Sequence, residues 1–212
     1  QDGWEQYEWR HKVKKTALKN SVSPKCERWN GESSPQSGKL LLVAEQGLGD
    51  TLQFMRYAHV LKHQGIDLSF CTQTKLHRLI QSSGIDPSPL APEQANQVDE
   101  GQWMPLLSVP RHLGVSPINP ITTDPYIKAS NKLVEKWSNL LSSEERPIIG
   151  INWHGNRQDN SRKSRNIPLE HILKLTSSLN ATFLSLQKDG QRLIPRQAYI
   201  TRKLLELQEE IS

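Results

Sequence analysis

Hydrophobic residues in this chain gather into short blocks, and the blocks alternate between two periodicities. Residues 40–44 (LLLVA) form a continuous apolar run of strand length, which is typical of a strand buried on both faces of a parallel sheet. Residues 50–64 repeat their apolar positions at helical spacing and end at Gly65, a residue that commonly terminates helices. This pair of patterns predicts a buried strand followed directly by a helix.

The same alternation continues along the chain. It predicts strands at 66–72, 103–110, 148–153 and 182–186, and helices at 75–83, 131–141 and 168–179. In the helix at 131–141, four residues are expected to face inward: Leu133, Trp137, Leu140 and Leu141. Strand, helix, strand, helix is the order of a doubly wound sheet. The predicted fold class is α/β: a Rossmann-like parallel-sheet domain, followed by the beginning of a second one.

Changes in composition divide the chain into three parts. Residues 1–38 are polar with scattered tryptophans and end in a Ser/Pro/Gly-rich stretch, so we expect a leader and linker without a core of its own. Residues 39–145 predict the N-terminal Rossmann-like domain. Residues 146–212 restart the strand–helix series but supply only two strands, fewer than in a sheet of ordinary size, and predict a partial C-terminal domain.

Composition narrows the classes of protein that this chain fits. No apolar stretch approaches the roughly 20 residues of a membrane-spanning helix, so no transmembrane segment is expected. Cys26 and Cys71 form no CxxC motif and have no histidines at zinc spacing, so neither a disulfide framework nor a metal site is predicted and a reducing cytoplasm is the simplest location. The net charge of +5 fits an acidic partner, or solubility alone. Because the chain does not begin with Met, we expect a fragment of a longer protein or a processed product, and we favour the fragment.

A glycine-rich turn at residues 45–50 (EQGLGD) follows the first buried strand and is the first candidate site. Gly47 and Gly49 are expected to allow a tight turn and the close approach of a ligand. A dinucleotide fingerprint would need a small residue at Leu52, and Asp50 would repel a pyrophosphate at the start of the helix. These two residues argue against a dinucleotide site.

Asp50 itself has two interpretations. It is a candidate general base, able to take a proton from a sugar hydroxyl. It is equally a candidate helix cap, with Gln53 three residues later imitating a capping box. Gln53 and Arg56 are candidate contacts for acceptor hydroxyl groups or for an acidic group, or they belong to a solvated helix face.

The second candidate site is a basic loop at residues 152–168. It carries four cations against a single acid, Asp159, and these cations are Arg157, Arg162, Lys163 and Arg165. With the free N–H groups of the helix that follows, they predict a site for a diphosphate, and His154 and Asn156 are candidate polar contacts there. The alternatives are a solvated basic loop and a nucleic-acid patch. Interleaved aromatic residues are lacking, so no nucleic-acid partner is predicted.

Several segments together resemble one family. They are EQGLGDTLQFMRY (45–57), PLLSVP (105–110), IGINWHGNRQDNSRKSRNIPL (149–169) and FLSLQ (183–187). The set is similar to the heptosyltransferase-like glycosyltransferase domain that follows tetratricopeptide repeats in many bacterial proteins. The opening GWEQYEWR (3–10) is similar to the segment that joins the repeats to that domain.

The resemblance implies a GT-B architecture, with the acceptor mainly on the first domain and the nucleotide sugar mainly on the second. Gly49-Asp50 matches a pair whose Asp acts as the base, and Arg165 matches a cation that binds the donor phosphate. Gln53 stands where the related enzymes often have His. The implied reaction is inverting transfer from a nucleotide-diphosphate sugar to a sugar or protein acceptor, with no cofactor and no metal.

The sequence departs from the family pattern after residues 185–188 (SLQK). Residues 196–212 (RQAYITRKLLELQEEIS) match none of the later strands, nor the Asp-Thr/Ser…His turn that grips the nucleotide sugar. Two functions therefore stay open: a glycosyltransferase truncated in its donor half, and a non-catalytic binding or interaction module derived from that fold.

Overall fold

The structure is a computed structural model that describes residues 2–12, 22–31, 35, 38–153, 166–177 and 179–186. The chain divides into two compact units, Gln1–Val134 and Glu135–Ser212. The boundary falls inside helix α6 (Asn131–Leu140), about ten residues before the predicted one at 145/146.

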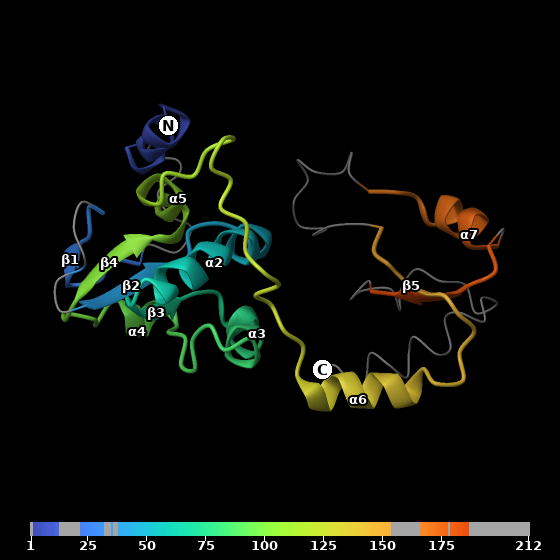
Figure 1. The fold of residues 1–212 in the computed structure, drawn as a ribbon. Helices are drawn as coiled ribbons and strands as arrows, with labels where there is room; N and C mark the ends of the chain where they lie inside the picture. Colours follow the sequence, from blue (N-terminus) through green and yellow to red (C-terminus); the bar gives the residue numbers. More distant parts are fainter. Residues whose placement is uncertain are drawn as a thin grey trace. The chain divides into compact units, whose positions relative to one another are not determined.

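Unit 1 is built on a parallel sheet of four strands in the order β1-β4-β2-β3 (Figure 1). The strands are β1 (Glu27–Arg28), β2 (Lys39–Val43), β3 (Asp67–Cys71) and β4 (Gln102–Pro105). In the centre, Leu41 of β2 lies opposite Ser69 of β3 on one side and Trp103 of β4 on the other. The fold is a Rossmann-like α/β fold, as the strand and helix patterns predict.

Helices and short 3-10 turns precede, connect and follow these strands. Before β1 lie α1 (Asp2–Tyr7) and η1 (Glu8–His11), and after β4 lie η5 (Leu106–Ser108) and α5 (Val109–His112). The elements between strands are α2 (Leu48–His63), η4 (Thr74–Leu76), α3 (His77–Ser82) and α4 (Pro92–Ala95). The predicted strand at 103–110 ends at Pro105, and its second half turns into η5 and α5.

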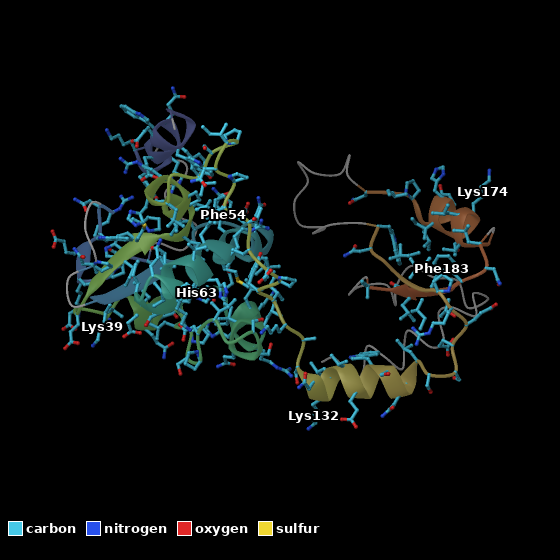
Figure 2. All side chains as sticks on the ribbon, viewed as in Figure 1. Lys39, Phe54, His63, Lys132, Lys174 and Phe183 are labelled. Atoms are coloured by element: carbon cyan, nitrogen blue, oxygen red, sulfur yellow. The ribbon has the colours of Figure 1, made fainter. Side chains whose placement is uncertain are left out.

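The run of apolar residues in β2 is continuous because both faces of the sheet are covered. Successive side chains of a strand point to opposite faces. Accordingly, Leu40 and Leu42 join one core cluster, with Met55 and Leu61 of α2. Leu41 and Val43 join a second cluster on the other face, whose remaining members are Val22, Cys71 and Ala95. Side chains fill the space between the sheet and its helices (Figure 2).

Residues 22–31 belong to unit 1 rather than to a detached leader. Strand β1 extends the sheet by pairing Glu27 with Gln102 and Arg28 with Trp103. Trp29 is 2% exposed and is part of the larger core cluster. The predicted division at residue 38 therefore differs from the structure, because a two-residue strand and a single buried tryptophan leave no periodic pattern in the sequence.

Unit 2 contains a short β-α-β series. Strand β5 (Ile148–Ile151) pairs in parallel with β6 (Thr182–Ser185), and α7 (Leu169–Ser177) lies between them in sequence. Phe183 of β6 is buried. Helix α6 buries none of its residues, contrary to the expectation that one face turns inward: Leu133 and Leu140 are both exposed.

No helix in the described parts of the chain is both long enough and apolar enough to cross a lipid bilayer.

Candidate functional site

The first candidate site lies where the sheet of unit 1 changes its winding direction. From β2 the chain continues to β3 on one side, and it later returns to β4 on the other side of β2. Open α/β sheets bind ligands at the carboxyl ends of two such neighbouring strands. The elbow, residues 45–50, leaves β2 at this edge, and η5 leaves β4 there. The elbow is therefore placed where the fold class puts its ligand chemistry.

Asp50 occupies the third position of helix α2. The helix begins at Leu48 with Gly47 as its N-cap, two residues earlier than predicted. Oδ2 of Asp50 accepts a hydrogen bond of 3.1 Å from the backbone N–H of Gly47. This is the half of a capping box in which the N3 side chain reaches back to the N-cap amide. Asp50 therefore caps the helix from position N3 and is not the N-cap residue itself. Gln53 takes no part in the cap.

The two glycines of the elbow do not serve an unusual backbone conformation. Gly47 has φ −71° and ψ 169°, an extended conformation open to any residue, and Gly49 lies within α2. The backbone of the turn therefore does not itself require glycine at either position, and the close approach of a ligand to these residues stays a prediction. A Cβ on Gly47 would lie 3.3 Å from Oδ2 of Asp50, whereas a Cβ on Gly49 would meet nothing within 4 Å. The open space at Gly49 leaves the backbone accessible.

The residue that sequence reasoning missed at this site is Glu45. Its side chain is 3% exposed and forms a two-point ion pair with Arg10, with Nε–Oε1 of 3.1 Å and Nη2–Oε2 of 2.9 Å. The backbone N–H of Leu107 also donates to Oε2 at 3.2 Å. Burial lowers the pKa of Arg10, but the carboxylates of Glu45 and Glu8 together outweigh this effect, and the net pKa is raised. Glu45 thereby ties the N-terminal helices to the ends of β2 and β4.

Glu8 and Ser108 complete this buried network. Arg10 Nη1 donates to Oε1 of Glu8 at 2.8 Å, and Arg10 Nη2 donates to the Ser108 hydroxyl at 2.8 Å. That hydroxyl in turn donates to Oε1 of Glu8 at 2.8 Å. Burial raises the pKa of Glu8, but the hydrogen bonds from Arg10 and Ser108 and the charges of Arg10 and His11 together outweigh it, and the net pKa is lowered. The network fills part of the strand edge with protein groups.

The backbone of the elbow is held from two further directions. The Gln46 side chain donates to the Tyr7 hydroxyl at 2.8 Å. From the other side, Gln73, which follows β3, donates to the carbonyl of Gln46 at 2.6 Å and accepts from the Thr51 hydroxyl at 3.0 Å. Trp4 packs edge-on against Phe54 of α2. These contacts fix the position from which Asp50 projects.

Gln53 and Arg56 lie on α2 but make no hydrogen bond to Asp50. The Gln53 side chain is exposed. Arg56 donates through Nε to the Gln53 carbonyl at 2.9 Å, and its guanidinium lies 5.7 Å from the ring centre of Tyr126. The structure therefore places the three residues along one helix without joining their side chains, so their contact with an acceptor stays a prediction.

The predicted donor-side residues, His154, Asn156, Arg162 and Arg165, lie outside the described residues. The structure describes the two ends of their loop, where the N–H of Ile167 donates to the carbonyl of Trp153 at 2.9 Å. Helix α7 begins soon after.

A cavity of about 720 Å³ lies beside the Glu8 network, between the N-terminal helices, the end of β1 and helix α5. Trp29 and His112 meet in it with ring centres 4.3 Å apart. Burial lowers the pKa of His112. Gly31 packs against this imidazole and has a positive φ of +84°. A Cβ at this position would lie 2.7 Å from Nδ1 of His112. Here, unlike at the elbow, glycine is required.

Among the described residues, no group of three or more His, Cys, Asp or Glu side chains could hold a metal ion. Comparisons with models of known protein families, with curated proteins and with solved structures find no match. The structure defines the chain as a Rossmann-like α/β protein.

Proposed function

We propose that the chain belongs to an inverting glycosyltransferase of GT-B type, in which unit 1 binds the acceptor and unit 2 holds the beginning of the donor side. The observation that carries this proposal is the position of Asp50. Its carboxylate stands at the carboxyl edge of a parallel sheet, at the switch point, on an elbow that is held from several sides.

The hydrogen bonding of Asp50 suits a general base. The structure gives its carboxylate one hydrogen-bond partner among the described residues, the Gly47 amide, which contacts Oδ2. Oδ1 is thereby left for an incoming hydroxyl, and the side chain is only partly buried. A base must come within hydrogen-bond reach of the proton that it removes.

In the proposed reaction, Oδ1 of Asp50 accepts the proton of the acceptor hydroxyl. The hydroxyl oxygen attacks the anomeric carbon of the donor sugar, and the bond from that carbon to the diphosphate breaks on the opposite face, which inverts the configuration. Arg165 and the other cations of the basic loop would stabilise the charge of the departing nucleoside diphosphate. The cavity beside Glu8 takes no part in these steps.

The test measures transfer from UDP- and ADP-sugars to simple sugar acceptors as release of nucleoside diphosphate. Asp50→Asn keeps the side-chain size but removes the base, and we expect the rate to fall about 10²- to 10⁴-fold. Asp67→Asn, an exposed acid at the start of β3, is the matched control and should leave the rate unchanged. Arg165→Ala should weaken donor binding. Equal rates for the Asp50 variant and the wild type would remove Asp50 from the base role.

The second candidate is the non-catalytic interaction module. The Arg10–Glu45–Glu8–Ser108 network favours it, because protein groups occupy part of the edge where a ligand would otherwise sit. The preceding tetratricopeptide repeats implied by the family resemblance would then be neighbours of α1. The non-catalytic module would be favoured if the chain showed neither saturable binding of any nucleotide-diphosphate sugar nor sugar transfer.

A reducing cytoplasm is the location that we propose for either function. Cys26 and Cys71 are both buried free thiols. Burial raises the pKa of Cys71 to about 12, so this thiol stays protonated and unreactive at neutral pH.

A further inference from the structure

Helix α2 carries two histidines, one turn apart, near its C-terminal end. The Nε2 atoms of His59 and His63 lie 3.0 Å apart, and the two rings meet at 79° with centres 4.5 Å apart. His63 is labelled on this helix in Figure 2. We propose that His59 and His63 form a two-imidazole chelating site for a late first-row transition metal ion, with Cu²⁺ bound more tightly than Ni²⁺ or Zn²⁺.

The distance between the two nitrogens fits a shared metal ion. Imidazole nitrogens bind such ions at about 2.0–2.1 Å. Two of them at that distance are about 2.9 Å apart when they subtend 90° at the metal, and about 3.3 Å apart at the tetrahedral angle. The observed 3.0 Å is close to the first value. Neighbouring positions at 90° belong to tetragonal Cu²⁺ and Ni²⁺ complexes, and Cu²⁺ leads the affinity order of divalent ions.

The helix backbone under the pair is fixed. Ala58, just before His59, and Leu61, between the two histidines, are fully buried in the core of unit 1. Side chains four residues apart on such a helix are neighbours. The nearest cation in sequence is directed elsewhere: Lys62 donates through Nζ to the carbonyls of Ile85 at 2.8 Å and Gly84 at 3.3 Å. The negative end of the helix dipole also favours a cation in the last turn.

Without a metal, one ring donates its Nε2–H to the Nε2 of the other. When a metal binds, the donating ring takes the tautomer with its proton on Nδ1, by exchange with solvent, and both Nε2 lone pairs become available. The metal then lies to one side of the line between the two nitrogens, and both rings turn toward it. No third His, Cys, Asp or Glu completes the site among the residues that the structure describes. The remaining coordination positions therefore go to water or to a small outside ligand, which makes the site open and the metal exchangeable.

The site is separate from the elbow. His59 follows Asp50 by nine residues on the same helix, which is about 13 Å along the axis at 1.5 Å per residue. A metal ion at the pair contacts neither Asp50 nor the Glu45 network. The proposal therefore stands or falls independently of the proposed function.

The test titrates tag-free chain with CuCl₂ in a non-coordinating buffer, followed by calorimetry and by electron paramagnetic resonance. We expect one strong Cu²⁺ site per chain with nitrogen ligands, and weaker binding of Ni²⁺ and Zn²⁺. His59→Gln and His63→Gln should each weaken Cu²⁺ binding about 10²-fold, because one linked ligand is lost. The matched control is His171→Gln, an exposed histidine on α7, which should bind as the wild type does.

Circular dichroism of each variant checks the fold, and two separate variants keep the test valid should one of them fail to fold. Asp50→Asn should bind Cu²⁺ normally. The proposal is overturned if strong Cu²⁺ binding survives in either histidine variant, if His171→Gln weakens it equally, or if the wild type shows no saturable site.

Discussion

Glu45 and Asp50 are two acids of the same elbow, five residues apart, with opposite surroundings. Glu45 is almost fully buried and held by Arg10 and by the Leu107 amide. Asp50 is partly exposed, and its described hydrogen bond is to Gly47. The first acid joins segments of the fold, whereas the second leaves an oxygen for another molecule. The residue type alone therefore does not identify a functional carboxylate at the edge of a sheet. Its hydrogen-bond and ion-pair partners decide whether it stabilises the fold or can bind another molecule.

Substitutions of these two acids are therefore expected to affect different properties of the protein. Substitutions of Glu45 or of its partners should lower the free energy of unfolding. Asp50→Asn keeps an oxygen that can accept the hydrogen bond from the Gly47 N–H, so it should leave stability nearly intact and affect the proposed transfer alone.

The largest effect on stability is expected from Glu45→Ala. It leaves the guanidinium of Arg10 buried without its main partner, and breaking a buried ion pair in this way costs about 3–5 kcal/mol. Urea unfolding measures the loss. Glu100→Ala is the control, since Glu100 forms an exposed pair with Lys39, worth about 1 kcal/mol or less. Similar losses for the two variants would mean that Glu45 is no more structural than a surface acid.

A smaller loss is expected from Gly31→Ala, beside the cavity. The new Cβ would lie 2.7 Å from Nδ1 of His112 in a backbone conformation with positive φ. Strain of this kind costs on the order of 1–3 kcal/mol. Gly49→Ala, at the open position of the elbow, should change the unfolding free energy by less than about 0.5 kcal/mol. If Gly31→Ala left the free energy of unfolding unchanged, His112 and Trp29 would be able to shift without cost, and the prediction would be wrong.

The smallest effects should appear in the pH dependence of stability. The pKa of His112 is lowered by burial, so the unfolded chain takes up this proton first and stability falls as pH drops through 6.5. The pKa of Glu8 is lowered from 4.5, so stability falls further as pH drops below that value. Burial also lowers the pKa of His11, which therefore contributes to the first step. Thermal unfolding at several pH values should show both steps, with His112→Gln reducing the first and Glu8→Gln the second. An unchanged profile in both variants would contradict this assignment.

The sequence predicted those parts of the fold whose signal is local. Strands β2 and β3 and helix α2 follow from runs of neighbouring apolar residues, and the parallel sheet follows from their alternation. Strand β1 was missed because two residues have no periodicity, and the burial of Trp29 depends on His112, which lies far along the chain. Short-range patterns cannot report contacts of that kind.

The same limit applies to the candidate site: residues in a local pattern could be predicted, and residues that depend on long-range contacts could not. Asp50 was found because an acid after a glycine turn at the end of a buried strand is a local pattern. The importance of Glu45 was not, because its partner Arg10 precedes it by 35 residues and an acid beside a turn resembles a solvated one. The opening GWEQYEWR holds both Glu8 and Arg10, so its role in bracing the elbow becomes visible only in the folded chain.

The role of Asp50 as the base is tested by the rate of sugar transfer of Asp50→Asn, measured together with its urea unfolding curve. We expect a rate about 10²- to 10⁴-fold below that of the wild type, with an unfolding midpoint close to the wild-type value. A variant that transfers sugar at the wild-type rate, or one that loses activity only because it unfolds, would contradict this role.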